Sequence, residues 1–332
     1  MMKASELLEL FSAHWSTAIL AAGVESNVFA LIEDGHSTAE DLARETGMEP
    51  RPVRALLDGL TGIGAIDTDD GVRYRNSEAV ARFLIAGRPG YLGGFARIVA
   101  GDGDGGMRQW SRLSEAFRSG RPVGPQAITT PDNPFWPELA MALQPVTEEV
   151  AAAAWDLLPV KDARKVLDVG GGTGAFALVW LRKSAGMTFT QLDWAPMNAL
   201  ALAQLTKSGL SSRFAVVDGD MHETEWEKQN DVVVLSNVLH HEPPEVNAAL
   251  LSRARAALAP GGILVVSEFA LDDTRRAPAF ALRFHAGMIL QTARGACYQA
   301  SEIRGWMERA GFDAVRTAPV PPLSTLVWGR AP

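Results

Sequence analysis

Apolar and polar residues follow two different rhythms along this chain of 332 residues. Up to about residue 158, apolar positions recur every three or four residues, which is the spacing of amphipathic helices. From residue 163 onward, short apolar runs alternate with helical segments. Because strands that alternate with helices form parallel sheets covered by helices on both faces, the second rhythm predicts an α/β domain.

The short apolar runs are the predicted strands of this sheet, at residues 166–169, 188–192, 213–217, 231–235 and 263–266. Two further runs, 314–318 and 324–328, flank the proline-rich segment 319–322. Such a turn segment joins neighbouring antiparallel strands. The predicted fold class is therefore α/β, with a mostly parallel Rossmann-like sheet, helices on both faces and a C-terminal antiparallel hairpin.

The N-terminal third predicts a different architecture. Helical spacing runs from Ser5 to about Asp34, and a capping-box pattern in which Ser37 answers Glu40 opens a helix that ends at Gly47. A second helix follows Pro52, and the segments 65–66 and 72–74 form a hairpin. This order predicts an α-helical winged-helix domain. The first helices are too apolar for a lone segment, so we expect the domain to mediate dimerisation.

A winged helix also suggests binding to DNA. Its second helix offers only Arg51 and Arg54, while the wing carries Asp67, Asp69 and Asp70, which would repel phosphates. The dimerisation interpretation is therefore favoured, and a ligand-sensing DNA-binding regulator is the alternative.

Residues 91–158 are predicted to be a mainly helical connector that contributes to the substrate pocket. The Gly-Asp repeat at 101–106 and the proline-rich segment 130–137 interrupt it, and a long helix follows over 140–158. The predicted domains are thus a winged helix at 1–90, a connector at 91–158 and a nucleotide-type domain at 159–332.

Composition narrows the protein class. A hydrophobic content of 47% is ordinary for a globular protein, and a formal net charge of −8 disfavours nucleic-acid and anionic-membrane partners. The single cysteine, Cys297, excludes an intrachain disulfide and favours a reducing compartment. Since the first residues are too acidic for a signal peptide and no apolar stretch is long enough to span a bilayer, we expect a cytoplasmic location.

Residues 165–174, Lys-Val-Leu-Asp-Val-Gly-Gly-Gly-Thr-Gly, form a strand followed by a glycine-rich turn. Gly170, Gly172 and Gly174 let the backbone press against a ligand, and a helix begins there with free N–H groups. The run also fits a variant of the dinucleotide fingerprint. Asp168 favours S-adenosylmethionine over a dinucleotide as the ligand, because a carboxylate repels a pyrophosphate and attracts the ammonium and sulfonium of S-adenosylmethionine.

Further polar residues follow the other predicted strands, where ligands of such sheets bind. Asp193 can bind both ribose hydroxyls, and Asp220 with Met221 can contact the adenine ring. Trp194 and Ser236 complete the predicted cofactor set.

His240 and His241 follow the fourth strand, and Glu268 ends the fifth. A neutral imidazole suits proton transfer near pH 7, and a carboxylate on the next strand could fix its tautomer. One alternative to a catalytic role is that the two histidines are purely structural. The other is that they bind a metal, but adjacent side chains point in different directions, so no metal is predicted.

Taken together, these residues resemble the S-adenosylmethionine-dependent O-methyltransferases of the caffeate and acetylserotonin type and their bacterial relatives. The resemblance extends over nearly the whole chain, through the glycine loop, Gly219–Met221, Val238–His240, 258–262 and 310–312. It implies an enzyme that methylates a hydroxyl of a small aromatic natural product, acting as a homodimer with S-adenosylmethionine as cofactor.

Position by position, the resemblance implies that His240 is the general base and Glu268 one of two flanking glutamates. It places Met288 and His285 at the acceptor, and an apolar pocket of Phe135, Trp136, Met141, Phe280, Phe284 and Met288 fits an aromatic substrate. The second glutamate is replaced by Cys297, and His241-Glu242 stands where the family has Asp-Trp. His241 as base, or methylation of carbon or nitrogen, or non-methyl chemistry with this cofactor, are therefore alternatives.

Overall fold

The computed structural model describes residues 2–123, 130–131, 133–321 and 323–332. Within it the chain forms two compact units, one of residues Met1–Ser111 with Met141–Pro145 and one of Arg112–Ala140 with Val146–Pro332. Each unit has its own hydrophobic core and is described by itself.

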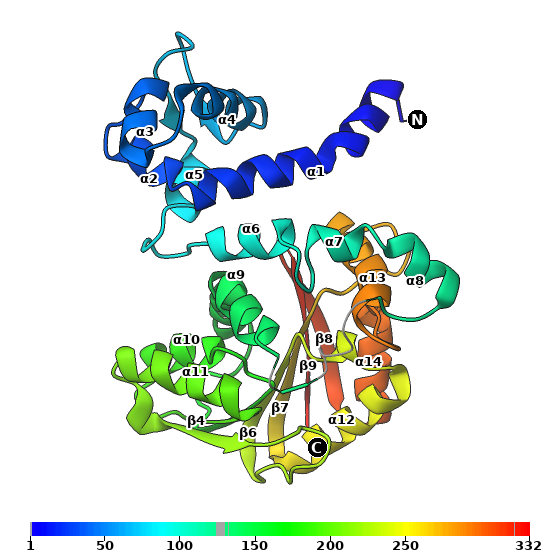
Figure 1. Cartoon of the computed structure of the whole chain (residues 1–332). Helices are drawn as coiled ribbons and strands as arrows, with labels where there is room; N and C mark the ends of the chain where they lie inside the picture. Colours follow the sequence, from blue (N-terminus) through cyan, green and yellow to red (C-terminus); the bar gives the residue numbers. More distant parts are fainter. Residues whose placement is uncertain (1, 124–129, 132, 322) are drawn as a thin grey trace. The chain divides into compact units, whose positions relative to one another are not determined.

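The N-terminal unit is helical with one short hairpin (Figure 1). Its elements are α1 (Ala4–Glu25), α2 (Val28–Glu33), α3 (Ala39–Thr46), α4 (Pro50–Gly62), β1 (Ile66–Asp67), β2 (Arg75–Asn76), α5 (Glu78–Phe83), α6 (Gly93–Ala100) and α7 (Met107–Trp110). Residues from α2, α3, α4 and the hairpin share one core, which includes Phe29, Leu42, Leu57 and Ile66. The order of helix, turn, helix and hairpin is the predicted one.

Two local predictions in this unit were wrong by a few residues. The cap of α3 is Thr38, whose hydroxyl accepts a hydrogen bond from the Asp41 N–H, and not Ser37. The second strand of the hairpin is β2 at Arg75–Asn76, beyond the predicted 72–74, because the Asp70 carboxylate bonds the N–H groups of Val72 and Arg73 into the turn. The Gly-Asp repeat does interrupt the helices, and it is closed by a bond from the Gly105 N–H to Gln109.

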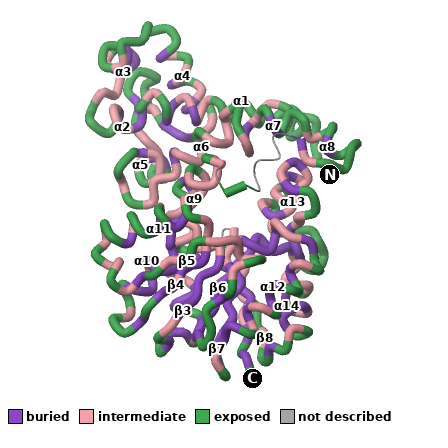
Figure 2. Tube along the Cα trace, turned by 60° about the horizontal axis from the view of Figure 1, so that its bottom comes forward, coloured by how far each residue is buried: buried purple, intermediate pink, exposed green. Residues whose placement is uncertain are grey.

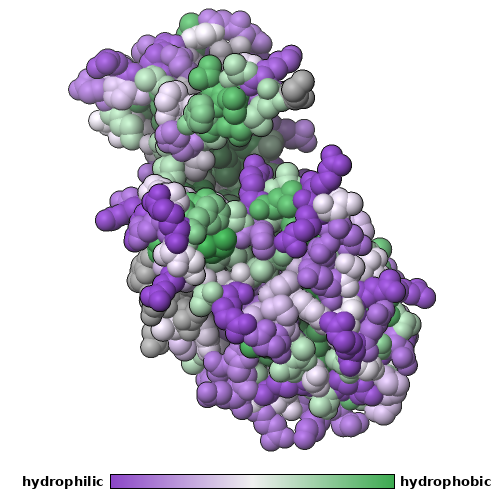
Figure 3. Space-filling view, turned by 90° about the vertical axis from the view of Figure 1, so that its right-hand side faces the viewer, coloured by the Kyte–Doolittle hydropathy of each residue, from purple (hydrophilic) through white to green (hydrophobic). Residues whose placement is uncertain are grey.

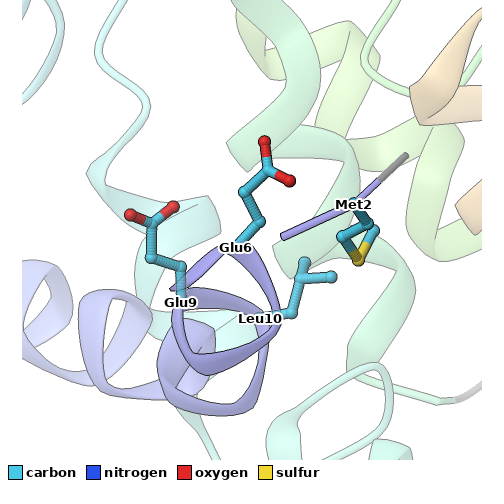
Figure 4. Close-up of a pocket in the computed structure, with 4 residues that line it drawn as sticks. All are labelled: Met2, Glu6, Glu9 and Leu10. Atoms are coloured by element: carbon cyan, nitrogen blue, oxygen red, sulfur yellow. The ribbon is translucent and has the colours of Figure 1, made fainter. Parts of the chain in front are cut away.

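Helix α1 leaves a row of large apolar side chains in solvent. They are Leu7, Leu8, Leu10, Phe11 and Trp15, each at least 43% exposed. Figure 3 shows apolar residues gathered on the N-terminal unit, and Figure 4 shows Met2 and Leu10 beside Glu6 and Glu9 at the start of α1. Among the described residues α1 is also the one helix whose length and composition would allow it to cross a membrane. An apolar row of this size marks a surface that another molecule covers.

The second unit carries the predicted α/β sheet. Its helices are α8 (Leu113–Ser119), α9 (Phe135–Leu157), α10 (Ala175–Lys183), α11 (Ala195–Lys207), α12 (Pro244–Ala257), α13 (Ala279–Gln291) and α14 (Ala300–Arg309), with 3-10 turns at Ser211–Arg213 (η2) and Leu239–His241 (η3). Its strands are β3 (Lys165–Val169), β4 (Thr188–Asp193), β5 (Phe214–Asp218), β6 (Asn230–Ser236), β7 (Leu258–Glu268), β8 (Asp313–Val320) and β9 (Ser324–Arg330).

The order of the strands across the sheet is β5-β4-β3-β6-β7-β9-β8. The first five are parallel, while β9 runs antiparallel to β7 and β8 antiparallel to β9, which confirms the predicted hairpin. Pro322, in the predicted turn of that hairpin, lies outside the described residues. The chain leaves β3 toward β4 on one side and returns to β6 on the other. Ligands of such sheets bind where the order reverses, so the carboxyl ends of β3 and β6 are the expected site.

Two hydrophobic layers cover the buried strands (Figures 1 and 2). Phe176 and Trp180 of α10 and Leu205 of α11 pack on one face with Val166 and Val234. Leu250 of α12 and Ile303 of α14 pack on the other face with residues that alternate with these, such as Leu167 and Val233. This alternation leaves the strand ends as the place where polar side chains emerge.

The connector begins its long helix earlier than predicted. Helix α9 starts at Phe135, so the predicted break at 130–137 ends at Pro134, and Trp136 lies in the first helical turn. The Asn133 carboxamide accepts a bond from the Phe135 N–H, which fixes this start. Asp132 of the predicted break lies outside the described residues.

Candidate active site

The glycine-rich turn joins β3 to α10 with three residues in the left-handed region. The φ angles of Gly170, Gly172 and Gly174 are 70°, 60° and 73°, where other residues are strained. A Cβ on Gly170 would also lie 2.8 Å from a methyl of Val238, and one on Gly174 would lie 2.9 Å from Leu205. The turn is therefore packed from both sides, and it lies against the loop that leads to His240.

Asp168 is a buried carboxylate without a partner. It is 1% exposed, and neither of its oxygens has a hydrogen-bond partner within the described structure. Burial and the nearby Asp193 carboxylate raise the pKa of Asp168 to about 8. An unpaired acid in this position is costly on its own, and a cationic ligand would remove that cost.

Asp193, at the end of β4, holds the other side of the turn. Its carboxylate accepts bonds from the Gly172 N–H at 2.9 Å and the Trp194 N–H at 2.7 Å. Burial raises its pKa to about 6, although these two N–H groups oppose the shift. The Trp194 ring lies edge-on to the Trp136 ring, with centroids 6.2 Å apart. The carboxylate and the indole thus border the same end of the glycine turn.

A buried amide pair that the sequence analysis missed supports this arrangement. The Gln191 side chain donates to the Gly172 carbonyl at 3.1 Å and to the Asn198 carboxamide at 3.2 Å. Asn198 in turn donates to the Asp193 carbonyl and to the Asp218 carboxylate, at 3.0 and 2.8 Å. The available signal was weak: a glutamine inside β4, a strand that also contains two threonines.

The residues predicted for the adenine and methionine ends lie on the neighbouring strand ends. The Asp220 carboxylate accepts the His222 N–H at 2.7 Å, and the Met221 carbonyl accepts the Trp226 indole N–H at 2.9 Å. The Ser236 hydroxyl, at the end of β6, is buried and lacks a partner among the described residues. These side chains and Asp168 therefore belong to one edge of the sheet.

His240 and Glu268 form a buried pair. Their side chains are 5% and 4% exposed, and Nδ1 of the imidazole lies 2.8 Å from Oε2 of the carboxylate. The other oxygen, Oε1, accepts the Leu239 N–H at 2.7 Å. Since Glu268 accepts the Nδ1 proton, Nε2 is left with its lone pair, and it has no partner among the described residues. The predicted contact between the two residues is confirmed.

The prediction that the two adjacent histidines point apart was wrong. The 3-10 turn η3 brings the rings of His240 and His241 to a centroid distance of 4.1 Å. Trp136 lies edge-on to His241 at 5.3 Å. Burial, and to a smaller extent His240, hold the pKa of His241 well below its usual range. His241 is therefore a neutral imidazole beside the carboxylate-held one.

Aromatic residues border His240 on the side of α13. Phe284 lies edge-on to His240 at 5.2 Å, Phe280 stacks on Phe284 at 5.9 Å, and Phe269 packs against both phenylalanines. Met288, one turn after Phe284, is fully buried. Phe284 thus lies next to His240, with Phe280 stacked behind it, and the role of both in a pocket stays a prediction. Met141 is described only in the N-terminal unit, so its assignment to the acceptor stays a prediction.

A loop after α13 touches the histidines from behind. The Ala296 N–H donates to the His240 carbonyl at 2.9 Å, and a Cβ on Gly295 would lie 2.4 Å from that oxygen. The Cys297 N–H donates to Nδ1 of His285 at 3.0 Å. Burial, reinforced by Glu268, raises the pKa of the Cys297 thiol to about 12, so this residue stays neutral. The role of Gly295 had no sequence signal, because a lone glycine in a loop is common.

The strand-end residues fit a cationic nucleoside. At the glycine turn and the end of β6, the buried oxygens without partners in the described structure include both oxygens of Asp168, the carboxamide oxygens of Gln191 and Asn237, and the Ser236 hydroxyl. Such a set requires a ligand that brings donors and positive charge. The side chains of the described residues form no group of three or more histidine, cysteine or acidic ligands that could hold a metal ion.

Two protein-family profiles match the chain. The O-methyltransferase domain matches residues 111–313, and the O-methyltransferase dimerisation domain matches residues 8–86. The chain belongs to the O-methyltransferase family. It is an S-adenosylmethionine-dependent methyltransferase, and the unpaired Asp168 beside the glycine turn is the feature of this chain that agrees best with that cofactor.

Individual relatives agree with this assignment. The 3-hydroxy-5-methyl-1-naphthoate 3-O-methyltransferase of Streptomyces sahachiroi is 30% identical, over 94% of this chain and 90% of its own. The tetracenomycin polyketide synthesis 8-O-methyl transferase of Streptomyces glaucescens is 29% identical, over 98% of this chain and 96% of its own. Among solved structures, human N-acetylserotonin methyltransferase has the same fold, with a TM-score of 0.85 and 21% identity. The match covers 99% of this chain and 98% of the human one.

Proposed function

We propose that this methyltransferase methylates a hydroxyl of a small aromatic acceptor, with His240 as the general base. The observation that carries the proposal is the buried pair, 2.8 Å apart, of Glu268 at the end of β7 and His240, which follows the loop that packs on the glycine turn. A base fixed in this way can take a proton from a hydroxyl next to the bound cofactor.

The proposed cofactor residues are grouped by the part of the cofactor that they contact. Asp168 and Ser236 hold the methionine end, Asp193 binds the ribose hydroxyls, and Trp194, Asp220 and Met221 surround the adenine. When bound, the cofactor supplies an electrophilic methyl group on a sulfonium. Asp168 is the acidic side chain of this set whose two buried oxygens both lack partners in the described structure, so it has the most to gain from a cation.

The chemistry of the protein residues is proton transfer and positioning. A phenol has a pKa of about 10, so little of it is ionised near pH 7. Nε2 of His240 accepts the proton as the oxygen attacks, and Glu268 keeps Nδ1 protonated and the ring in place. General-base help of this kind typically contributes about 10²- to 10⁴-fold in rate.

An aromatic acceptor fits the phenylalanines beside His240. Phe284 and Phe280 present flat apolar surface, with Phe269 behind them. His285 and Met288, on the same helix, complete the proposed acceptor side. The two bacterial relatives named above act on a naphthoate hydroxyl and in tetracenomycin polyketide synthesis, which supports the same substrate class.

The experiment is incubation with methyl-labelled S-adenosylmethionine and a pool of aromatic hydroxy compounds, followed by mass spectrometry and NMR of the product. The proposal requires a labelled methyl on oxygen. A label on carbon or nitrogen would assign the alternative reaction on the same fold, and cofactor binding without any transfer would contradict the proposal.

We further propose that the protein acts as a homodimer through its N-terminal unit. The matched dimerisation domain and the exposed apolar row of α1, which includes Phe11 and Trp15, support a second copy as the partner. Sedimentation should give twice the chain mass. Replacing Phe11 and Trp15 by Asp and Glu should yield monomers, and an unchanged mass would exclude this surface.

A further inference from the structure

His241 is a second imidazole next to the proposed base, and the proposed proton transfer does not use it. Its ring centre lies 4.1 Å from that of His240, with the planes inclined by 45°. Its ring nitrogens have no hydrogen-bond partner among the described residues, whereas Nδ1 of His240 is bound to Glu268. A polar side chain in this position is available to a substrate.

The chemistry of the two rings differs. His240 is paired with the Glu268 carboxylate at Nδ1, while no carboxylate of the described residues is paired with His241. Burial and His240 both lower the pKa of His241, so the ring stays neutral. A neutral imidazole carries one N–H donor and one lone-pair acceptor, which suits a hydrogen bond to an uncharged oxygen.

The surrounding rings limit how an acceptor can reach the base. Trp136 stands edge-on to His241 at 5.3 Å, and Phe284 stands edge-on to His240 at 5.2 Å. Since Glu268 occupies Nδ1, a hydroxyl must approach Nε2 on the opposite side of the His240 ring. An aromatic molecule bound there comes within one ring width of His241, so its neighbouring substituent meets the second imidazole.

We propose that His241 determines acceptor specificity by hydrogen-bonding an uncharged oxygen on the ring carbon next to the methylated hydroxyl. The favoured substrates are thus aromatic rings with a vicinal pair of oxygens, either two hydroxyls or a hydroxyl and a carbonyl. The two oxygens of such a pair lie roughly 2.7 Å apart, about one hydrogen-bond length, which two imidazoles at this separation can contact together. The inference rests on the proposed function, because it assumes that the acceptor hydroxyl meets His240.

The test compares two isomers that differ only in the spacing of their hydroxyls. Binding of 2,3-dihydroxynaphthalene and of 2,7-dihydroxynaphthalene to the full-length protein saturated with S-adenosylhomocysteine is measured by titration calorimetry. One additional hydrogen bond should make the vicinal isomer bind about 3- to 10-fold more tightly. Since no methyl is transferred, the result does not depend on which atom the enzyme methylates.

Three variants assign the preference to His241. His241→Phe keeps a flat ring without nitrogens and should reduce the ratio of the two affinities to about one. His241→Asn restores a donor and an acceptor and should recover part of the ratio. His36→Phe, a histidine of the N-terminal unit, is the matched control and should retain the wild-type ratio.

Each possible result either supports or overturns the proposed role of His241. A vicinal preference that His241→Phe abolishes and His241→Asn partly restores supports the proposal. Equal binding of the isomers by the wild type, failure of both to bind, or a preference that survives His241→Phe overturns it. Affinity for S-adenosylhomocysteine, measured for each variant, shows that the site is folded. Failure of the proposed function would appear separately, as an absence of labelled methyl on oxygen.

Discussion

The two halves of the active site satisfy their polar groups in opposite ways. At the proposed cofactor end, the Asp168 carboxylate and the Ser236 hydroxyl are buried without partners in the described structure. At the base, Glu268 accepts from an imidazole and from backbone N–H groups, and aromatic rings surround the pair. The first half lacks a partner for its buried carboxylate until a cation binds, whereas in the second the contact that orients His240 is made before any substrate arrives.

This difference indicates where binding energy is used. A buried charge without a partner destabilises the free protein, so a cationic ligand gains affinity by neutralising it. A base that is already oriented gains nothing from the cofactor but needs no reorganisation during the reaction. We therefore expect substitutions to divide cleanly between cofactor affinity and turnover.

The largest expected effect is on turnover. His240→Ala removes the group that accepts the hydroxyl proton, so kcat should fall by about 10²- to 10⁴-fold. Affinity for S-adenosylhomocysteine, measured by calorimetry, should change less than about threefold, because His240 is not part of the cofactor end. An equal loss of both quantities would mean that the histidine only maintains the fold, and a loss found in His241→Ala alone would make His241 the base.

The converse substitution is Asp168→Asn, which keeps the shape and removes the charge. Affinity for S-adenosylhomocysteine should fall roughly 10- to 100-fold, as expected for a charged hydrogen bond. At pH 9 the midpoint of thermal unfolding of the free protein should rise, because an unpaired buried charge is gone. Asp231→Asn, at the opposite end of the sheet, is the control: it removes the charge from the oxygen that accepts the N–H groups of Arg164 and Lys165 and should lower only stability.

Cofactor affinity should depend on pH through the same group. The pKa of Asp168 in the free protein is raised to about 8, and a cation binds the ionised form. Affinity should therefore rise by up to about tenfold per pH unit between pH 6.5 and 8, and Asp168→Asn should flatten this profile.

The stability of the free protein should fall as the pH rises, whereas cofactor affinity should increase. Folded-state pKa values of about 8 for Asp168 and about 6 for Asp193 exceed the ordinary value, so these groups stabilise the fold at acidic pH. That contribution is lost progressively as the pH rises above the ordinary value of 3.8, and the loss is complete at about 6 for Asp193 and about 8 for Asp168. Thermal unfolding of the free protein across this range checks the sign, and a profile unaffected by Asp168→Asn would contradict the assignment.

The smallest effects come from a matched pair of buried asparagines. Asn198 supports the cofactor end through Asp193, and Asn247 supports the histidine loop by donating to the carbonyls of Leu239 and Glu242. Replacing either by Ala should lower the free energy of unfolding by about 2–3 kcal/mol in urea titrations. Asn198→Ala should weaken cofactor binding severalfold, whereas Asn247→Ala should lower kcat. Identical effects would show that the halves are not independent.

The positions of the proposed cofactor residues at the strand ends were easier to predict from the sequence than the surroundings of the proposed base. Polar residues directly after apolar strands are easily recognised, and parallel strands bring their ends together, so Asp168, Asp193 and Ser236 could be placed before the structure was known. Gln191 lies inside a strand and could not be. The edge contact of Trp136 with His241 joins segments far apart in the chain, and no local pattern reports it.

Errors in the prediction arose where geometry departs from the regular element. The two histidine rings approach because η3 is a 3-10 turn, in which neighbouring side chains are not spread as on a strand. The cap of α3 and the start of β2 were displaced because several Ser, Thr and Asp residues compete for the same N–H groups.

The contact of Gly295 with the His240 carbonyl restricts how the enzyme can diversify. The loop after α13 supports the proposed base, His240, through its main chain, so exchanging this loop to obtain a new substrate range would shift His240 as well. Evolution or engineering of this scaffold should therefore proceed through the side chains of α13, leaving the loop backbone untouched.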